Sequence, residues 1–515
     1  METTLKLIML LTAALALGIR SLYFVHMLQL NSYRPERYSK WCKENDSRLV
    51  NWRALLPALL LPAMYLPSLY CYIAGIVILA LTATLNFPKK AKKPLVFTAR
   101  VKRLLAALFG LYALALVLCW FLDSLRCAGF TALLSLLPWF WVGLVNKLML
   151  PLEKHIANGF VRDARRRLEA MTDLTVIGIT GSYGKTSTKN FLHALLSVRY
   201  NVLMTPESYN TTMGVVRTIR ERMKPSHEIF IAEMGAKNPG DIREICDLVT
   251  PQYGILTSVG EQHLETFKTL DAIISTKFEL ADALPENGCL LANGDNPHIR
   301  THLEEKTPRC PVVTYGLETN DFTAVIDKVD TTGCTFTVTV CGKSQVFTTK
   351  LLGAHNIQNL VGCIAMAVRL GIPMEELVYP VRLLRPVEHR LQLLPNGFID
   401  DAYNSNPAGF RGALDVLSQF DAQRVLVTPG MVELGERQEA LNRELGAYAS
   451  DKCDYAILVG EKQAPPLKAG LLSAGFPEEK LFVVKTLKDG LAVLNALPRA
   501  EKRIVLLEND LPDNF

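Results

Sequence analysis

The sequence contains no Cys-x-x-Cys pair, and none of its 11 cysteines has the spacing to histidine that metal sites require. We therefore interpret the cysteines as reduced, mostly buried thiols of a protein that faces the cytoplasm. Internal repeats and low-complexity tracts are also missing. The formal net charge is only +6, and the basic residues cluster beside apolar runs. This pattern argues for orientation in a membrane and against nucleic-acid binding.

What the sequence does contain is two regions of different composition. Apolar residues make up 49% of its 515 residues, and a chain of this length is enough for three or four domains. The apolar residues are concentrated in residues 1–150, whereas residues 151–515 have the mixed composition of a soluble α/β protein. The composition therefore predicts an α-helical membrane region followed by α/β domains.

Five apolar stretches in residues 1–150 are candidates for membrane-spanning helices, each of which needs about 20 apolar residues. The second and third are short and meet at residues 65–72, so they form either a tight hairpin or one kinked, re-entrant element. A cleavable signal peptide is not expected, because Lys6 is the only basic residue at the start and no small-residue cleavage site follows. The stretches are Leu5–Leu28, Ala54–Tyr70, Tyr72–Phe87, Leu104–Phe121 and Phe130–Met149.

Lysine and arginine residues in the short loops predict the orientation of these spans. Residues 34–53 carry six of them and residues 89–103 carry seven, whereas residues 122–129 carry only Arg126. We expect the N-terminus outside the cell membrane, and both basic loops and residues 151–515 in the cytoplasm. The alternative is a buried helical bundle of a soluble protein. Arg20 lies in the first stretch, where it either snorkels to the interface or meets an anionic headgroup.

A phosphate-binding turn follows in the stretch "VIGITGSYGKTSTKNFLHAL", residues 176–195. Its apolar start predicts a buried parallel strand, and its end predicts an amphipathic helix. Ile179 stands where the usual G-x-x-x-x-G-K-[ST] pattern has its first glycine, so the match is to a shorter form. In that form Lys185 reaches the phosphates and Thr186 helps to hold Mg²⁺. The loop that cradles a polyphosphate through its backbone N–H groups comprises Gly181, Ser182, Tyr183, Gly184, Lys185, Thr186 and Ser187.

Three further positions lie where a phosphate site would use them. Glu233 ends a second apolar strand, where a carboxylate suits a Mg²⁺ ligand. His263 follows a third strand, although a loop histidine without a function is an equal alternative. Lys277 and Glu279 lie on a predicted helix, and the alternative for this pair is a solvated helix face.

These segments, in their order along the chain, resemble the Mur ligase family. The resemblance runs from about Leu174 to Asp510 and is strongest to the MurF type, which adds D-alanyl-D-alanine to a UDP-linked muramoyl peptide. The order of the nine motifs is specific for the fold and the ATP chemistry, and much less specific for the substrate. The motifs are "GITGSYGKTSTK", "AEMGAKNPGDI", "TSVGEQHLETF", "STKFEL", "ANGDNP", "LGAHNIQNLVGCIAMA", "RPVEHRLQ", "DDAYNSNPAGFRGAL" and "GMVELGE".

The resemblance implies an ATP-dependent ligase that forms an amide bond through an acyl phosphate. ATP would phosphorylate a muropeptide-type carboxylate, and an amino acid or dipeptide amine would then attack. Thr186 and Glu233 match the ligands of one Mg²⁺ ion, and His263 matches a ligand of a second. Lys277 matches a lysine that family members carry as a carbamate, an anion that tolerates nearby Mg²⁺ better than an ammonium group does.

Other matches concern the nucleotide and the substrate. The segment with His355, Asn356 and Asn359 resembles the one that lines the adenine and ribose. Arg390 and Asp401 resemble residues that complete the nucleotide site when the domains close. Asn404 and Asn406 suit polar contacts with the substrate or nucleotide, and the alternative is that they only cap turns.

The expected organisation follows from the same resemblance. Residues 1–150 are the membrane region, and residues 151–172 form a basic linker helix that contacts anionic lipid. Residues 173–384 are the ATP-binding central domain with a parallel sheet, in which residues 312–350 read as antiparallel strands. Residues 385–515 form a smaller Rossmann-like domain, and ATP is expected between the two domains.

The match fails at the N-terminus. Members of the family carry a soluble domain there for the UDP end of the substrate, and this chain has a membrane region instead. The activity is therefore MurF-like addition in peptidoglycan precursor synthesis or, alternatively, amide formation on a lipid-linked precursor or a polyglutamate-type amide. Thr428 and Pro429 also replace a turn common in the family, which puts the C-terminal substrate contacts in doubt.

Overall fold

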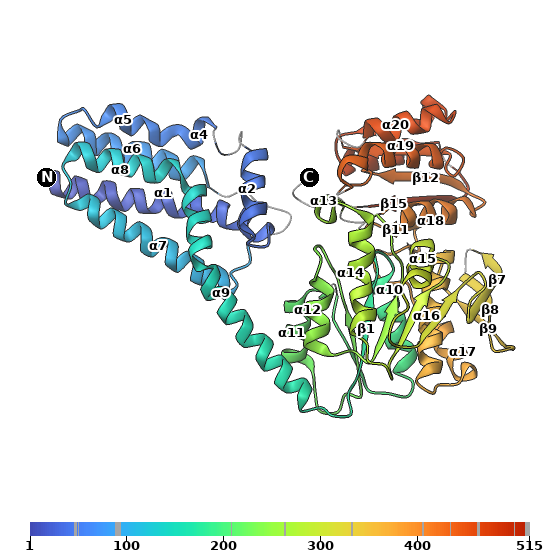
Figure 1. The fold of residues 1–515 in the computed structure, drawn as a ribbon. Coiled ribbons are helices and arrows are strands. Elements are labelled where there is room, and N and C mark those ends of the chain that lie inside the picture. Colours follow the sequence, from blue (N-terminus) through green and yellow to red (C-terminus); the bar gives the residue numbers. More distant parts are fainter. Residues whose placement is uncertain are drawn as a thin grey trace. The chain divides into compact units, whose positions relative to one another are not determined.

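The computed structural model describes residues 1–45, 49, 51–87, 94–207, 209–261, 264–330, 333–403, 406–432, 434–460, 464–498 and 500–509. The chain divides into two compact units, Met1–Gly159 and Phe160–Phe515 (Figure 1). Ten of the cysteines are buried as free thiols and Cys341 is exposed, as the sequence predicts.

The first unit is built from helices. α1 packs against α6, α7 and α8, and these helices lie side by side in Figure 1. Apolar residues fill the interior and also cover much of the outside, where Leu11, Val77 and Leu118 are exposed. A helix that is apolar all round suits a lipid environment. The helices are α1 (Glu2–Leu30), α2 (Pro35–Glu44), α4 (Trp52–Leu55), η1 (Leu56–Leu59), α5 (Leu60–Ala63), α6 (Ser68–Leu85), α7 (Ala99–Trp120), α8 (Ser124–Leu136) and α9 (Pro138–Glu169).

Three of these helices, α1, α6 and α7, are long and apolar enough to cross a membrane, and α8 with α9 makes a fourth if a bent pair counts as one span. The sequence predicted five spans. Residues 54–70 are divided among short helices because Pro57 and Pro62 interrupt the pattern of backbone hydrogen bonds. The stretch predicted at 130–149 is broken before Pro138, where α8 and α9 differ in direction by 74°.

The linker predicted at residues 151–172 is not a separate helix. α9 is continuous from Pro138 to Glu169, with Pro151 inside it. From Phe160 onward it packs on the second unit, where the Arg220 guanidinium lies 4.3 Å from the centre of the Phe160 ring. Arg220 also forms an ion pair with Asp163 at 2.7 Å. The basic residues at the end of α9 are therefore partly used in contacts within the second unit.

The second unit contains a nine-stranded sheet with the order β2-β3-β1-β4-β5-β6-β7-β8-β9. Neighbouring strands from β2 to β7 are parallel, and β7, β8 and β9 are antiparallel. Residues 312–350 were predicted as antiparallel strands. This is correct for β7, β8 and β9, which extend the main sheet, but β6 is parallel to both of its neighbours. The strands are β1 (Thr175–Thr180), β2 (Val202–Met204), β3 (Ile229–Glu233), β4 (Tyr253–Leu256), β5 (Cys289–Asn293), β6 (Val312–Gly316), β7 (Phe322–Asp330), β8 (Gly333–Val340) and β9 (Lys343–Thr349).

Both faces of this sheet are covered, which is why its central strands read as continuous apolar runs. Ile177 and Ile179 of β1 pack into one core with Phe191, whereas Val176 packs into the other core with Ile245 and Phe278. The helices of this part are α10 (Lys185–Leu196), α11 (Thr212–Arg222), α12 (Asp241–Val249), α13 (Leu264–Phe267), α14 (Leu270–Ala283), α15 (Pro297–Glu305), α16 (Ala354–Arg369) and α17 (Met374–Leu383).

The last part of the unit is a six-stranded sheet with the order β10-β11-β15-β12-β13-β14. All neighbouring strands are parallel except β10 and β11, in agreement with the predicted Rossmann-like domain. Its strands are β10 (Gln392–Leu393), β11 (Phe398–Asp401), β12 (Gln423–Thr428), β13 (Tyr455–Val459), β14 (Leu481–Val484) and β15 (Arg503–Glu508). Its helices are α18 (Pro407–Ser418), η2 (Gly435–Arg437), α19 (Gln438–Ala449), α20 (Ala464–Ser473), η3 (Glu478–Lys480) and α21 (Leu487–Ala496).

Candidate nucleotide site

The predicted phosphate loop joins the carboxyl end of β1 to the first turn of α10. Two of its glycines are required by the backbone, with φ angles of +149° at Gly181 and +82° at Gly184. A Cβ atom on Gly181 would lie 2.1 Å from Thr257 Oγ1, and one on Gly184 would lie 2.7 Å from Asn359 Oδ1. Only glycine therefore lets the loop turn here and expose its amides at the start of a helix.

The loop is held from the segment after β4. Ser182 N donates to Ser258 O at 2.7 Å, Tyr183 N donates to Ser258 Oγ at 2.9 Å, and the Tyr183 hydroxyl donates to Glu261 O at 2.6 Å. Ser187 is buried in the first turn of α10. These contacts fix the loop without using Lys185 or Thr186.

Lys185 is folded back over the loop. Its ammonium donates to Gly181 O at 2.6 Å and to Ser182 O at 2.9 Å. Burial lowers the pKa of Lys185 to about 8, the Glu233 carboxylate opposes this change, and the Arg390 guanidinium adds to it. An anionic phosphate in the loop would favour the charged amine.

Glu233 lies at the end of β3, beside the loop, and is almost fully buried. Its Oε1 accepts hydrogen bonds from Thr186 Oγ1 at 3.0 Å and from Asn210 Nδ2 at 3.1 Å. Its Oε2 lies 3.0 Å from the ammonium of Lys189, which is equally buried. The structure thus brings together Thr186 and Glu233, two oxygen-bearing side chains that suit Mg²⁺.

Lys277 lies within α14 with only 2% of its surface exposed. No hydrogen bond or ion pair of its amine is found in the described part of the chain. Burial, reinforced by the charge of Lys185, lowers the pKa of Lys277 far below its ordinary value. Glu279, in contrast, accepts from Gly240 N at 2.7 Å and Arg243 N at 2.8 Å at the start of α12. The alternative of a solvated helix face therefore does not describe Lys277.

The six-stranded sheet contributes the opposite wall of a cleft of about 410 Å³. Arg390 Nη2 donates to Thr186 Oγ1 at 3.3 Å, so the guanidinium reaches the phosphate loop. Asp401 is paired in register with Glu508 across β11 and β15. Burial raises the pKa of Asp401 to about 6, and hydrogen bonds from Leu391 N and with the Glu508 side chain oppose the rise.

Polar residues of α16 line the same cleft. Asn356 Nδ2 donates to Leu352 O at 2.9 Å, and the Asn359 amide lies against Gly184. His355 also lines the cleft, and burial lowers its pKa to about 4, so this imidazole is neutral at physiological pH. The cleft thus has neutral polar groups of α16 beside the charged phosphate loop.

Three other predictions have different outcomes. Asn406 lines the cleft but also caps α18, because its Oδ1 accepts from Gly409 N at 2.8 Å. The capping alternative is therefore present at Asn406, and its contact with a substrate stays a prediction. His263 and Asn404 lie outside the described residues. Within the described residues, no group of three or more His, Cys, Asp or Glu side chains is arranged to hold a metal ion.

Sequence reasoning missed two charged residues of the site. Lys189 is the partner of Glu233, and its signal was its place on α10, one helical turn after Lys185. Glu508 is almost fully buried at the end of β15 and lines the cleft. A carboxylate at the carboxyl end of a parallel strand was the available signal, the same one that identified Glu233.

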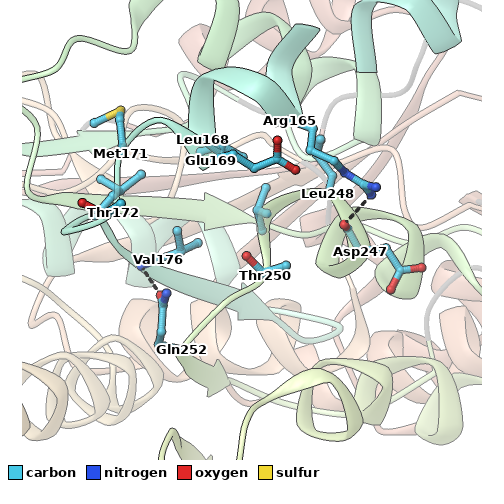
Figure 2. Close-up of a pocket in the computed structure, with 12 residues that line it drawn as sticks. Arg165, Leu168, Glu169, Met171, Thr172, Val176, Asp247, Leu248, Thr250 and Gln252 are labelled. Carbon is cyan, nitrogen blue, oxygen red and sulfur yellow. Dashed lines mark hydrogen bonds between the residues drawn. The ribbon is translucent and has the colours of Figure 1, made fainter. Parts of the chain in front are cut away.

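A second cavity, of about 310 Å³, lies at the other end of β1 (Figure 2). The end of α9 and the segments before β1 and β4 line it. Figure 2 shows Arg165 donating to Asp247 O, at 2.8 Å, and Gln252 accepting from Val176 N, at 2.6 Å. Ligands of open parallel sheets bind at the carboxyl ends of the strands, so this cavity is not at the candidate nucleotide site.

Comparison with protein families matches both parts of the second unit. The model described as the Mur ligase middle domain matches residues 179–367. The model described as the glutamate ligase domain of Mur ligases matches residues 389–507. Together these matches include the phosphate loop, Glu233, Lys277 and Arg390.

Individual relatives agree. The UDP-N-acetylmuramoyl-tripeptide–D-alanyl-D-alanine ligase of Bacillus subtilis is 32% identical over 56% of this chain, and the match spans 63% of that protein, a little under two-thirds. The Escherichia coli enzyme of the same name is 31% identical over 60% of this chain and 70% of that protein. MurF from Acinetobacter baumannii superposes with a TM-score of 0.63 at 25% identity, over 68% of this chain and 77% of that chain.

A second solved structure bears on the nucleotide. MurF ligase from Thermotoga maritima, in complex with ADP, superposes with a TM-score of 0.63 at 25% identity, over 69% of this chain and 80% of that chain. The two domain matches, the order of the motifs and the glycine-dependent loop agree with one another, and on this basis the chain belongs to the Mur ligase family.

Proposed function

We propose that this protein is an ATP-dependent ligase that forms an amide bond in peptidoglycan precursor synthesis. The observation that carries the proposal is the contact of Thr186 with both Glu233 and Arg390 at the phosphate loop. One hydroxyl thereby joins the two walls of the nucleotide cleft. This arrangement suits phosphoryl transfer, which needs positioned charge and no protein nucleophile.

We assign a separate role to each group of residues in the cleft. Lys185 and the loop amides would hold the phosphates of ATP, and Asn356 and Asn359 would line the nucleoside. Thr186 and Glu233 would hold one Mg²⁺ ion, which neutralises developing negative charge when bound. His263 is proposed to hold a second ion. Arg390 and Asp401 would complete the site from the C-terminal domain.

Lys277 is proposed to act as a carbamate. Its burial and lowered pKa favour the neutral amine, the form that reacts with carbon dioxide. The carbamate oxygens could then orient the metal shell. An unmodified ammonium would instead repel Mg²⁺ and add to the positive charge of Lys185.

For the substrates we propose a UDP-linked muramoyl tripeptide as the carboxylate and D-alanyl-D-alanine as the amine. The support is the name shared by the Bacillus subtilis and Escherichia coli relatives. Asn406 would contact the substrate from the cleft, and Asn404 is proposed for the same role.

We further propose that residues 1–159 lie in the cell membrane and that the ligase domains face the cytoplasm. The support is the three long apolar helices and the outward apolar residues such as Leu11 and Leu118. A membrane position would favour an acceptor that diffuses in the same plane, because tethering raises its local concentration. A lipid-linked muropeptide is therefore the alternative to the UDP-linked one.

The experiment is phosphate release by the purified full chain with ATP and Mg²⁺, with products identified by mass spectrometry. UDP-linked and lipid-linked muropeptides are compared, each with D-alanyl-D-alanine or glutamate. We expect release only with a muropeptide and D-alanyl-D-alanine, and loss of release in Lys185→Ala. The matched control is Lys343→Ala, a change of an exposed lysine on β9. Release that persists in Lys185→Ala, or that glutamate alone stimulates, would contradict the proposal.

A further inference from the structure

A buried arginine lies inside the first unit. Arg20 lies in the C-terminal half of α1, and only 4% of its surface is exposed. Its neighbours on the helix, Leu17 and Phe24, are buried in an apolar core. Its guanidinium donates to Ser135 O, in the last turn of α8. No carboxylate lies within ion-pair distance of Arg20 in the described residues.

One acceptor is too few for this side chain. A guanidinium has five N–H donors and remains charged at any physiological pH. The same bundle shows what a simple helix cap looks like, because the Lys6 ammonium donates to Trp120 O at 2.7 Å and Leu122 O at 2.6 Å. Two of the three N–H donors of Lys6 therefore have an acceptor. Among the described residues, Ser135 O is the one acceptor for the five N–H donors of Arg20. Capping of α8 therefore does not account for the guanidinium.

Two polar groups around the break between α8 and α9 have no hydrogen-bond partner among the described residues. They are the buried hydroxyl of Ser135 and the indole N–H of Trp141. The nearby hydroxyls of Ser21 and Tyr112 bond to each other at 2.9 Å. The region therefore holds a buried positive charge whose polar neighbours are neutral hydroxyl and indole groups, none of which supplies a counter-charge.

From this buried charge without a counter-charge we infer that the Arg20 region is a binding site for a phosphate-type anion. The planar fork of a guanidinium matches two oxygens of a phosphate group. The hydroxyl of Ser135 would supply a further donor. A bound anion would also supply the counter-charge that a buried cation requires.

The favoured source of the anion is the headgroup of a phosphate-bearing lipid. The helices around Arg20 are apolar on their outer faces, where acyl chains would lie. Ionisable residues inside such bundles commonly mark ligand or ion sites. A free phosphate or pyrophosphate has the same chemistry and is the other source. The site is separate from the ligase cleft, so the success or failure of one proposal does not decide the other.

The full chain is suited to a direct test, because all five tryptophans lie within residues 41–141. Tryptophan fluorescence therefore reports on the first unit alone. The purified protein in maltoside micelles, which contain no phosphate, is titrated with dioleoyl phosphatidate and, separately, with inorganic phosphate and pyrophosphate. We expect a saturable change with phosphatidate, with one lipid retained per chain in native mass spectrometry.

Arg20→Gln should weaken this binding roughly 10- to 100-fold, the size expected for a lost charge-assisted hydrogen bond. Arg126→Gln is the matched control with the same change of charge, since Arg126 is exposed and pairs with Asp123. If Arg20→Gln does not fold, the same binding test is made with Arg20→Lys and Ser135→Ala. Each of these variants is expected to show a smaller loss of affinity. If free phosphate binds as tightly as phosphatidate, the site binds a soluble anion and not a lipid headgroup. No saturable binding of any probe, or unchanged binding in the folded Arg20 and Ser135 variants, would overturn the inference.

Discussion

The buried ion pair beside the phosphate loop gives a prediction with a calculable size. Lys189 Nζ and Glu233 Oε2 lie 3.0 Å apart, and both side chains are 1% exposed. Lys189→Met would leave the Glu233 carboxylate buried with only Thr186 and Asn210 as donors. Removing one partner of a buried pair costs about 3–5 kcal/mol. We therefore expect a loss of unfolding free energy of that size around β3 and α10.

Hydrogen–deuterium exchange, read on peptides that cover β3 and α10, measures this loss locally. The slowest amides should exchange about 150- to 5,000-fold faster in Lys189→Met. Lys306→Met is the matched control, because Lys306 forms an ion pair with Asp282 at 2.9 Å but both side chains are partly exposed. A surface pair of this kind contributes at most about 1 kcal/mol.

The reasoning is refuted if exchange in Lys189→Met is no faster than in Lys306→Met. A double change tests the coupling itself. In Lys189→Met with Glu233→Leu no buried charge is left alone, so the loss should be smaller than the sum of the two single losses. If the loss of unfolding free energy in the double variant equals the sum of the two single losses, the two charges do not stabilise each other.

Three further predictions concern the amine groups and the membrane. Lys277→Ala should be nearly inactive in phosphate release and partly rescued by added short carboxylic acids, which restore a negative charge. Unchanged activity of Lys277→Ala, or equal stimulation of Lys343→Ala by the acids, would argue against a carbamate. Because burial holds the pKa of Lys185 near 8 and phosphates favour its charged form, ADP binding should take up protons at about pH 8 and almost none at about pH 6.5. Calorimetry in buffers of different ionisation enthalpy measures this uptake, and Lys185→Arg should abolish it. If the ligase domains face the cytoplasm, an impermeant maleimide should label the exposed Cys341 only after intact cells are broken, and labelling in intact cells would place these domains outside.

The sequence predicted the ligase part of the fold closely, because local and tertiary preferences agree there. The stretch before Gly181 is a strand with both faces buried, and such strands are apolar throughout. The glycines, Lys185 and Thr186 are adjacent in the chain, so their grouping needs no tertiary contact. Family membership and the MurF-like fold were therefore predicted from the motifs.

The prediction was less accurate where residues distant in sequence come into contact, and where prolines interrupt an apolar stretch. Hydropathy alone does not show that Pro57 and Pro62 divide an apolar run into short pieces. Glu508 faces Asp401 only because β15 pairs with β11, a contact over more than a hundred residues. The roles of the site residues stay predictions, and those of His263 and Asn404 lie outside the described residues.

The position of β15 has a consequence for biosynthesis. This strand, Arg503–Glu508, pairs with β11 on one side and β12 on the other, in the middle of the C-terminal sheet. The sheet therefore cannot close during translation until β15 has left the ribosome, long after the helices of residues 1–159 have been made. A chain interrupted before Arg503 lacks the strand that joins β11 to β12, and with it the Glu508 wall of the cleft. Ribosome stalling late in the message would thus give a protein that has its helical first unit but lacks a complete candidate nucleotide site.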